Sequence, residues 1–175
     1  MNTTAGVGIV AALSLLAGVG FAQNTPDWEV SGGYRYVRAF DPSPVNASGF
    51  SAAAQENMNS WFGAVVEAGA SFQSQPAIRN QLVTFMFGPQ LTSRKSSRLQ
   101  PFVRAMIGGA RVTVTDGPSG TGLALDGGAG ADVRMAANVF LRINADFLRT
   151  AVSGQVQKDV QAGVGIVYCI GRTNR

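Results

Sequence analysis

From Thr25 onward, neighbouring residues alternate in character, and this period of two constrains the fold more than any other feature of the chain. Residues 139–150 illustrate it, since one set there is apolar and the intervening set largely polar. Val139, Leu141, Ile143, Ala145 and Phe147 alternate with Phe140, Arg142, Asn144, Asp146 and Leu148. Successive side chains of a β-strand point to opposite faces. The alternation therefore predicts strands that have one apolar and one polar face.

The same pattern predicts eight strands. They cover residues 28–38, 49–57, 61–72, 80–93, 99–112, 123–134, 139–150 and 156–170. Three connections are short (58–60, 94–98 and 135–138), whereas three others are longer and rich in turn-forming residues (39–48, 73–79 and 113–121). An even strand number, with short turns on the periplasmic side and longer loops outside, is typical of single-chain bacterial barrels. With the N-terminus in the periplasm, odd-numbered strands run outward. We predict an all-β fold, an eight-stranded antiparallel up-and-down transmembrane β-barrel over residues 23–175, without a second domain.

Residues 1–22 are predicted to be a cleaved signal peptide. Ala5 to Phe21 is a continuous run of apolar residues, glycine and one serine, and no charged residue precedes Asp27. The small residues Gly20 and Ala22 stand three and one positions before a cut at Gln23, as signal cleavage requires. The rival interpretation is a permanent membrane helix, which needs about 20 apolar residues. The run is shorter and is followed by polar QNTPD, which favours the signal peptide.

The composition of the polar face separates a membrane barrel from a soluble one. A soluble eight-stranded barrel of the lipocalin type alternates in the same way, but its apolar face points inward. Its outer face would be dense in Lys and Glu. Here the polar face is mostly Gly, Ala, Ser, Asn and Gln, and charged residues make up only 14% of the chain. Small residues suit the narrow lumen of eight strands. We therefore predict that the polar face lines the lumen and the apolar face meets lipid.

Aromatic residues on the apolar face gather at two heights. Those expected near the periplasmic end are Trp28, Phe62 and Tyr168, and those expected near the outer end are Tyr36, Phe50, Phe72 and Phe147. Belts of this kind mark the two membrane interfaces. A Lys or Arg at the lipid midplane costs about 2–4 kcal/mol, and the middle of this face carries none.

Charged residues of both signs are predicted to point into the lumen. By parity they are Glu29, Arg35, Glu67, Arg104, Asp126, Asp132, Arg134, Arg142, Asp146 and Asp159. An unpaired charge in a poorly hydrated space is costly. We therefore expect a mixed salt-bridge network that plugs the barrel. The alternative is a gate that opens when the pairs exchange partners.

A second set of cations is predicted at the outer rim, mostly with lipid-facing parity. It comprises Arg38, Arg79, Arg111, Arg149 and Lys158. Lipopolysaccharide presents phosphates at that height, and Arg binds phosphate well. We hypothesise contacts between these residues and lipopolysaccharide phosphates. The alternative is that polar residues simply flank the strand ends.

Four segments resemble a known family. WEVSGGYRYVR, FMFGPQLTSRKSSRLQPFVRAMIGGARV, NADFLRT and AGVGIVY resemble the bacterial outer-membrane β-barrel family related to the OmpA transmembrane domain, over Trp28 to Gly171. The resemblance implies an eight-stranded barrel in the cell outer membrane that the outer-membrane assembly machinery inserts. Many members end the last strand with an aromatic recognition residue, a role that falls here to Tyr168 or Ile170. The resemblance implies little about individual function.

The sequence carries no recognisable catalytic apparatus. It has no histidine, which excludes His-dependent triads and dyads and the commonest metal ligand. The run GGAGAD at 127–132 lacks the Lys and the helix of a phosphate loop. A single cysteine, Cys169, forms neither an internal disulfide nor a Cys-rich metal site. The net charge is +4, but no basic and aromatic stretch indicates nucleic acid. We expect a non-enzymatic monomer without cofactor, metal or nucleic-acid partner, in contact with outer-membrane lipids and lipopolysaccharide.

Three roles remain open on the sequence alone. The first is a structural barrel that supports envelope integrity. The second is a small porin-like channel for ions or small solutes. The third is a surface adhesin that acts through extracellular loops such as 39–48, although these loops lack the aromatic anchors of a large specific interface.

Overall fold

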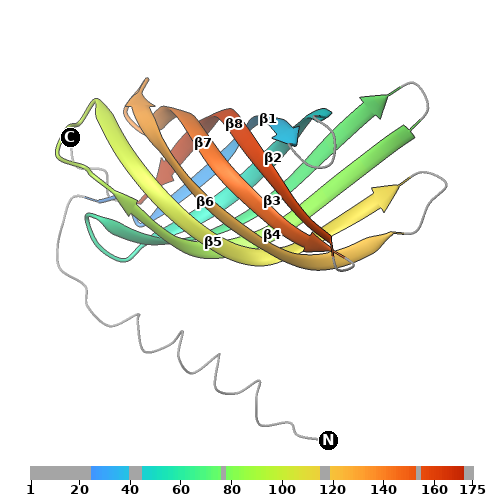
Figure 1. The fold of residues 1–175 in the computed structure, drawn as a ribbon. Helices are drawn as coiled ribbons and strands as arrows, with labels where there is room; N and C mark the ends of the chain where they lie inside the picture. The colour runs from blue at the N-terminus through green and yellow to red at the C-terminus, as the bar shows by residue number, and fades with distance from the viewer. Residues whose placement is uncertain (1–24, 40–44, 76–77, 115–118, 153–154, 172–175) are drawn as a thin grey trace, which may run out of the picture.

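The computed structural model describes residues 25–39, 45–75, 78–114, 119–152 and 155–171. Eight strands form a closed barrel in which each strand is antiparallel to its chain neighbours and the last pairs with the first (Figure 1). The strands are β1 (Trp28–Ala39), β2 (Val45–Asn57), β3 (Phe62–Gln75), β4 (Ile78–Thr92), β5 (Leu99–Val114), β6 (Gly120–Arg134), β7 (Val139–Val152) and β8 (Gln155–Ile170). The predicted fold and all eight strands are confirmed. The predicted signal peptide, residues 1–22, lies outside the described residues.

The barrel has two rims that differ in their connections. At the N-terminal rim β1 begins, β8 ends and three turns lie between strands, at 58–61, 93–98 and 135–138. At the loop rim, on the right of Figure 1, the connections are 40–44, 76–77, 115–119 and 153–154. The predicted contrast between short turns and longer loops is therefore wrong. Strand pairing continues past the predicted ends, because a paired neighbour satisfies the backbone whatever the side chains are.

The register shows that the strands are tilted against the barrel axis. Partners of Val103 lead once around the sheet through Ala129, Ala145, Ala162, Tyr36, Ser48, Phe72 and Gln81 to Thr113. The circuit thus returns to β5 ten residues beyond its start. Barrels with such a stagger have strands inclined by about 35–45°.

Two glycines face each other where the barrel closes. Gly33 of β1 pairs with Gly165 of β8. A Cβ atom on Gly33 would collide with the backbone of Val164 and Gly165. The close approach of β1 and β8 at this point therefore requires glycine.

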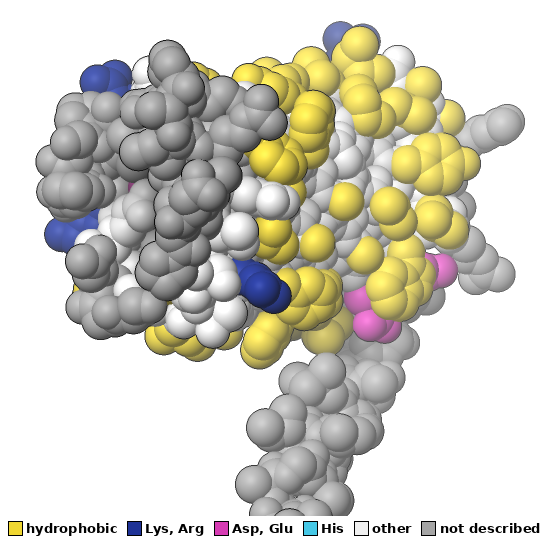
Figure 2. Space-filling view, turned by 90° about the vertical axis from the view of Figure 1, so that its right-hand side faces the viewer, with side chains coloured by type: hydrophobic (Ala, Val, Ile, Leu, Met, Phe, Trp, Pro, Cys, Tyr) yellow, Lys and Arg dark blue, Asp and Glu magenta, His cyan; other side chains and the backbone are white. Residues whose placement is uncertain are grey.

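The outward face is apolar, as predicted. Large hydrophobic side chains are exposed on every strand, and Figure 2 shows them covering the barrel wall with Lys and Arg side chains at its margin. Among the strand residues whose side chains the structure describes, the exposed charges are Arg38, Glu56, Arg111, Arg149 and Lys158. Each lies within four residues of a strand end. The described residues contain no helix long and apolar enough to span a membrane.

Six of the seven predicted belt residues are exposed on this outward face. They are Trp28, Tyr36, Phe50, Phe72, Phe147 and Tyr168. Phe62 is instead half-buried beside Trp61, with their ring centroids 5.7 Å apart. Trp61 is itself exposed near the N-terminal rim and was not among the predicted belt residues. The rings of Tyr34, Phe85 and Phe87 are also exposed outside the predicted belts, so aromatic residues are less confined to two levels than predicted.

The inward face contains an apolar cluster as well as polar groups. Val65, Met86, Met106, Ala110, Ala124 and Leu148 pack together inside the barrel. Met86 and Leu148 are completely buried. The alternation pattern predicted mainly small residues, polar residues and charges on this face. Large apolar side chains therefore fill part of the lumen that small residues would have left open.

Candidate functional site in the lumen

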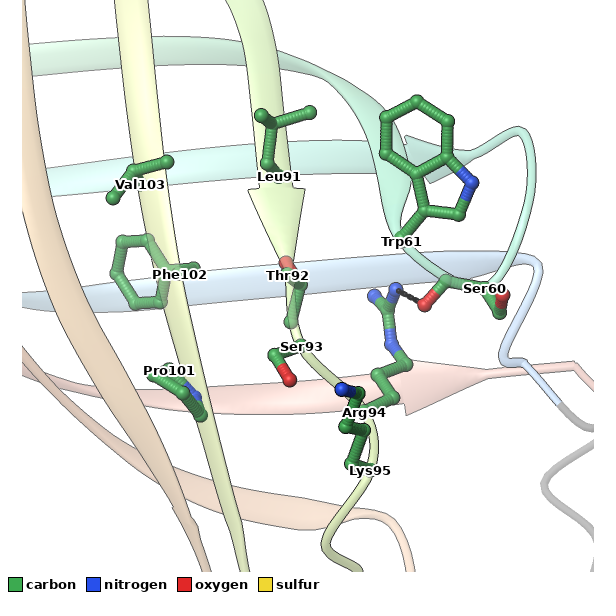
Figure 3. Close-up of a pocket in the computed structure, with 10 residues that line it drawn as sticks. All are labelled: Ser60, Trp61, Leu91, Thr92, Ser93, Arg94, Lys95, Pro101, Phe102 and Val103. Carbon is green, nitrogen blue, oxygen red and sulfur yellow. Dashed lines mark hydrogen bonds between the residues drawn. The ribbon is translucent and has the colours of Figure 1, made fainter.

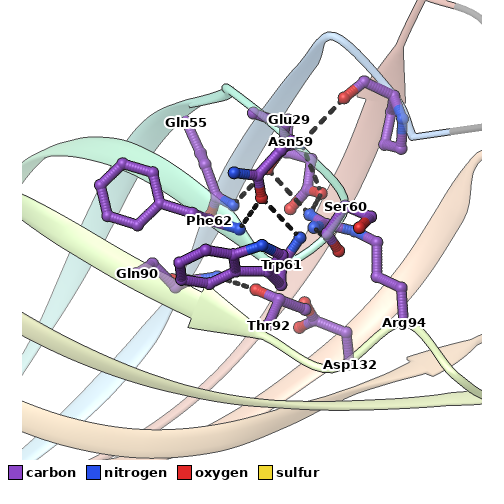
Figure 4. A network of polar contacts seen from close by, with 12 residues as sticks. Glu29, Gln55, Asn59, Ser60, Trp61, Phe62, Gln90, Thr92, Arg94 and Asp132 are labelled. Carbon is purple, nitrogen blue, oxygen red and sulfur yellow. Dashed lines mark hydrogen bonds and ion pairs between the residues drawn. The ribbon is translucent and has the colours of Figure 1, made fainter. Parts of the chain in front are cut away.

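A polar cluster lies in the lumen near the N-terminal rim, and Glu29 of β1 is at its centre. One carboxylate oxygen of Glu29 accepts a hydrogen bond from Arg94 at 2.6 Å and another from Asn57 at 3.0 Å (Figure 4). Its second oxygen lies 3.6 Å from the Arg142 guanidinium. Arg94 also donates to Asn57 and to the backbone carbonyl of Ser60. The cluster thus ties β1, β2, β7 and two turns together.

Arg142 of β7 connects this cluster to Asp132 on the adjacent strand β6. Its guanidinium donates two parallel hydrogen bonds of 2.7 Å to the Asp132 carboxylate on β6. Its central carbon also lies 4.6 Å from the centroid of the buried Phe102 ring. Bidentate pairing fixes the plane of the guanidinium as well as adding energy, and the contact with the aromatic face adds a further attraction. Arg142 is therefore held in one orientation across the lumen.

A second group of charges lies further along the barrel. Glu67 of β3 accepts hydrogen bonds from Arg35 and, at 2.8 Å, from Arg104. Arg104 also donates to Asp146 at 2.9 Å, and Asp146 accepts a further bond from Asn144. All four charged residues are buried. This chain of ion pairs connects strands β1, β3, β5 and β7, which do not neighbour one another in the sheet.

Two of the predicted inward carboxylates are buried without an ion pair to any residue that the structure describes. Asp126 has no hydrogen-bond partner for either carboxylate oxygen among the described residues. Asp159 accepts one bond from Gln157 at 2.9 Å, while its other oxygen has no partner there. Both point inward as predicted, but neither joins the salt-bridge network formed by the described residues.

The prediction that Arg134 belongs to the lumen network is wrong. The Arg134 guanidinium instead donates to the backbone carbonyls of Ala136 and Ala137, at 3.3 and 3.0 Å. It also lies 5.9 Å from the Phe140 ring centroid. Arg134 is the last residue of β6. Its long side chain therefore reaches the adjacent turn rather than the lumen.

Arg94 belongs to the lumen charge network but was not among the predicted inward charges. It lies in the turn between β4 and β5, where the alternation that sorts inward from outward residues has ended. Its side chain extends from the turn into the lumen and forms an ion pair with Glu29. The signal for it was the charge balance of the whole predicted inward set, which contains six carboxylates and four guanidinium groups and so indicates a further cation.

Two hollows differ in position and in chemistry. A groove of about 700 Å³ lies at the N-terminal rim, between the Trp61 turn, Leu91 of β4 and Val103 of β5 (Figure 3). It is mostly apolar. Within the lumen, a cavity of about 30 Å³ lies beside Arg35, Glu67 and Arg104, with room for about two water molecules. We take the lumen network as the candidate site, because its buried charges converge there although the groove is larger.

The predicted outer cations lie on the outward face near the loop rim. Arg38, Arg111, Arg149 and Lys158 are exposed there. Arg79 belongs to β4, but its side chain lies outside what the structure describes. The described residues also contain no group of three or more His, Cys, Asp or Glu side chains arranged to hold a metal ion.

A closed barrel with an apolar outer wall, exposed aromatic side chains and buried charges that are mostly paired inside belongs to the class of transmembrane β-barrels. Bilayer-spanning sheets must close, because lipid offers no partner for the backbone of an edge strand. A soluble barrel of the lipocalin type places its apolar face inside. Here large apolar side chains are exposed on the outward face instead.

Solved structures share this architecture. The structure of Neisserial surface protein A (NspA) matches with a TM-score of 0.74 at 14% identity, covering 82% of this chain and 97% of that chain. Ail, the attachment invasion locus protein of Yersinia pestis, in complex with the heparin analogue sucrose octasulfate, matches with a TM-score of 0.59 at 17% identity, covering 82% and 98%. The N-terminal β-barrel domain of Pseudomonas aeruginosa OprF matches with a TM-score of 0.55 at 13% identity, covering 82% and 98%.

These likenesses show that the chain has the fold of eight-stranded outer-membrane barrels. No family model matches the sequence, and none of the curated proteins matches it.

Proposed function

We propose that this protein is a non-enzymatic outer-membrane barrel with a plugged lumen, whose role is structural support of the envelope. The observation that carries the proposal is that both ion pairs and apolar side chains occupy the lumen. Ion pairs cross it between strands that are not neighbours, and Met86, Met106 and Leu148 pack beside them. Eight strands enclose little space to begin with. In this proposal the N-terminal rim faces the periplasm.

The rival role, a small channel, requires a water-filled path. The free volume beside the central ion pairs, about 30 Å³, fits a plug better than a pathway. A gate would require Arg104 to leave both Glu67 and Asp146. Breaking a buried ion pair by removing one partner costs about 3–5 kcal/mol, so such an opening is rare at equilibrium.

The test is conductance in planar bilayers. Purified protein should give no steady single-channel current. A triple variant with Arg35→Ala, Glu67→Ala and Arg104→Ala removes the central ion pairs and should admit ions. Lys95→Ala, at an exposed turn residue of the N-terminal rim, is the matched control and should remain silent. Large steady currents from the unmodified protein would contradict the plug.

A cellular comparison separates structural support from transport. Host cells without the protein should become more sensitive to detergent, and uptake of small solutes should not change. A loss of solute uptake with unchanged detergent resistance would favour the channel instead.

A further inference from the structure

Two cations face each other directly on the outside of the barrel. Arg149 of β7 and Lys158 of β8 are partners in the β7–β8 ladder. Both side chains are exposed. Side chains of directly opposed residues in an antiparallel pair begin about 4.5–5.5 Å apart, and like charges at such positions are destabilising. The pair therefore concentrates positive charge at one point of the wall.

The surroundings of this pair contain further positive charge. On β1, Arg38 pairs with Val160, which lies two residues from Lys158 on the same face of β8. Among the described carboxylates, only Asp27 and Glu56 are exposed, and both lie at the N-terminal rim. Asp159 is next to Lys158 in the chain but is buried in the lumen. The described part of this surface thus offers no carboxylate to Arg149 and Lys158.

The depth of the pair is fixed by the residues beside it. Phe147 and Val160 form the adjacent outward-facing pair on the same two strands, toward the barrel centre. Both are exposed on the apolar wall, and Phe147 is a residue of the predicted aromatic belt. An aromatic belt marks the boundary between acyl chains and headgroups. Arg149 and Lys158 therefore lie at headgroup level.

We propose that Arg149 and Lys158 form a binding site for a phosphate group of lipopolysaccharide, with Arg38 at its edge. Arg supplies a planar fork that matches phosphate oxygens, and Lys supplies a compact charge beside it. A phosphate between them offsets their mutual repulsion. The proposal rests on the orientation in the proposed function, because only the loop rim then reaches the leaflet that contains lipopolysaccharide.

The test compares lipopolysaccharide retained by variants purified from outer membranes. The double variant Arg149→Gln, Lys158→Gln should retain at least fivefold less lipopolysaccharide per barrel than the unmodified protein. The matched control, Lys95→Gln with Arg98→Gln, removes two exposed cations from the N-terminal rim and should retain the full amount. Equal retention by the double variant, or an equal loss in the control, would overturn the proposal. Heat-dependent gel mobility verifies that each variant is folded.

A reconstitution identifies the group that is bound. Purified barrels are placed in nanodiscs that contain intact lipopolysaccharide, lipopolysaccharide stripped of its lipid phosphates, or phosphatidylglycerol. Native mass spectrometry should detect binding of the intact form, with loss of binding when the phosphates or the two cations are removed. Equal binding of the stripped form, or a preference for phosphatidylglycerol, would overturn the assignment. These outcomes do not depend on conductance. The proposal of a lipopolysaccharide site can therefore be contradicted without contradicting the proposal of a plugged lumen, and the reverse is also true.

Discussion

At the scale of single residues, the lumen depends on arginines that each serve two acceptors. Arg104 bridges Glu67 and Asp146, and Arg142 bridges Asp132 and Glu29. Such shared pairing offsets the desolvation of several charges with few side chains, since each guanidinium offers five N–H donors. Removal of one arginine therefore affects more than one carboxylate.

Arg142→Met should destabilise the barrel by about 3–5 kcal/mol, because it leaves the buried Asp132 carboxylate without its bidentate partner. The double variant Arg142→Met, Asp132→Leu removes both charges and should recover most of that loss. Urea unfolding in detergent micelles, followed by gel mobility, measures both free energies. A double variant less stable than the single one would contradict the explanation that the loss comes from the unpaired Asp132 carboxylate.

Parity predicts which way a residue points, but not which partner it finds. It placed nine of the ten expected charges in the lumen. It failed for Arg134, whose position at a strand end lets the side chain bend back to turn carbonyls. It gave no information about Arg94, which lies outside any strand. The absence of a partner for Asp126 among the described residues likewise depends on geometry across the barrel, which a sequence pattern does not contain.

At the scale of elements, the strands were predictable because each has one face in lipid and one in the lumen. That contrast repeats every two residues wherever a strand lies within the membrane. Near the loop rim the contrast fades, as in 45–48 and 73–75, although backbone pairing continues. The extra residues of β2 and β3 were therefore assigned to loops.

The β1–β8 contact tests the role of glycine in closing the barrel. Gly33→Val should destabilise the barrel by about 1–3 kcal/mol, because the new side chain collides with the backbone of Val164 and Gly165. Gly127→Ala is the matched control, since a Cβ there meets nothing within 4 Å. It should change stability by less than about 0.5 kcal/mol. Folded fractions after refolding into micelles provide the measurement, and equal effects of the two substitutions would contradict the explanation.

At the scale of the whole molecule, closure makes the barrel a single cooperative unit. Every strand is hydrogen-bonded on both sides, and lumen side chains link strands that are not neighbours in the sheet. The unheated protein should therefore remain folded in sodium dodecyl sulfate and migrate differently from the boiled protein on gels. It should also fractionate with the outer membrane. Recovery as a soluble periplasmic protein would contradict the membrane assignment.

The pairing of β1 with β8 also determines the order in which the barrel can be completed. These strands lie at opposite ends of the sequence, so their contact closes the longest loop in the chain and carries the largest entropic cost. Every other pairing joins consecutive strands and can form locally. Until β8 has arrived, β1 remains an open edge that can pair with another chain. The two terminal strands must therefore both be shielded until they pair with each other, whereas every other pairing joins strands that are consecutive in the chain.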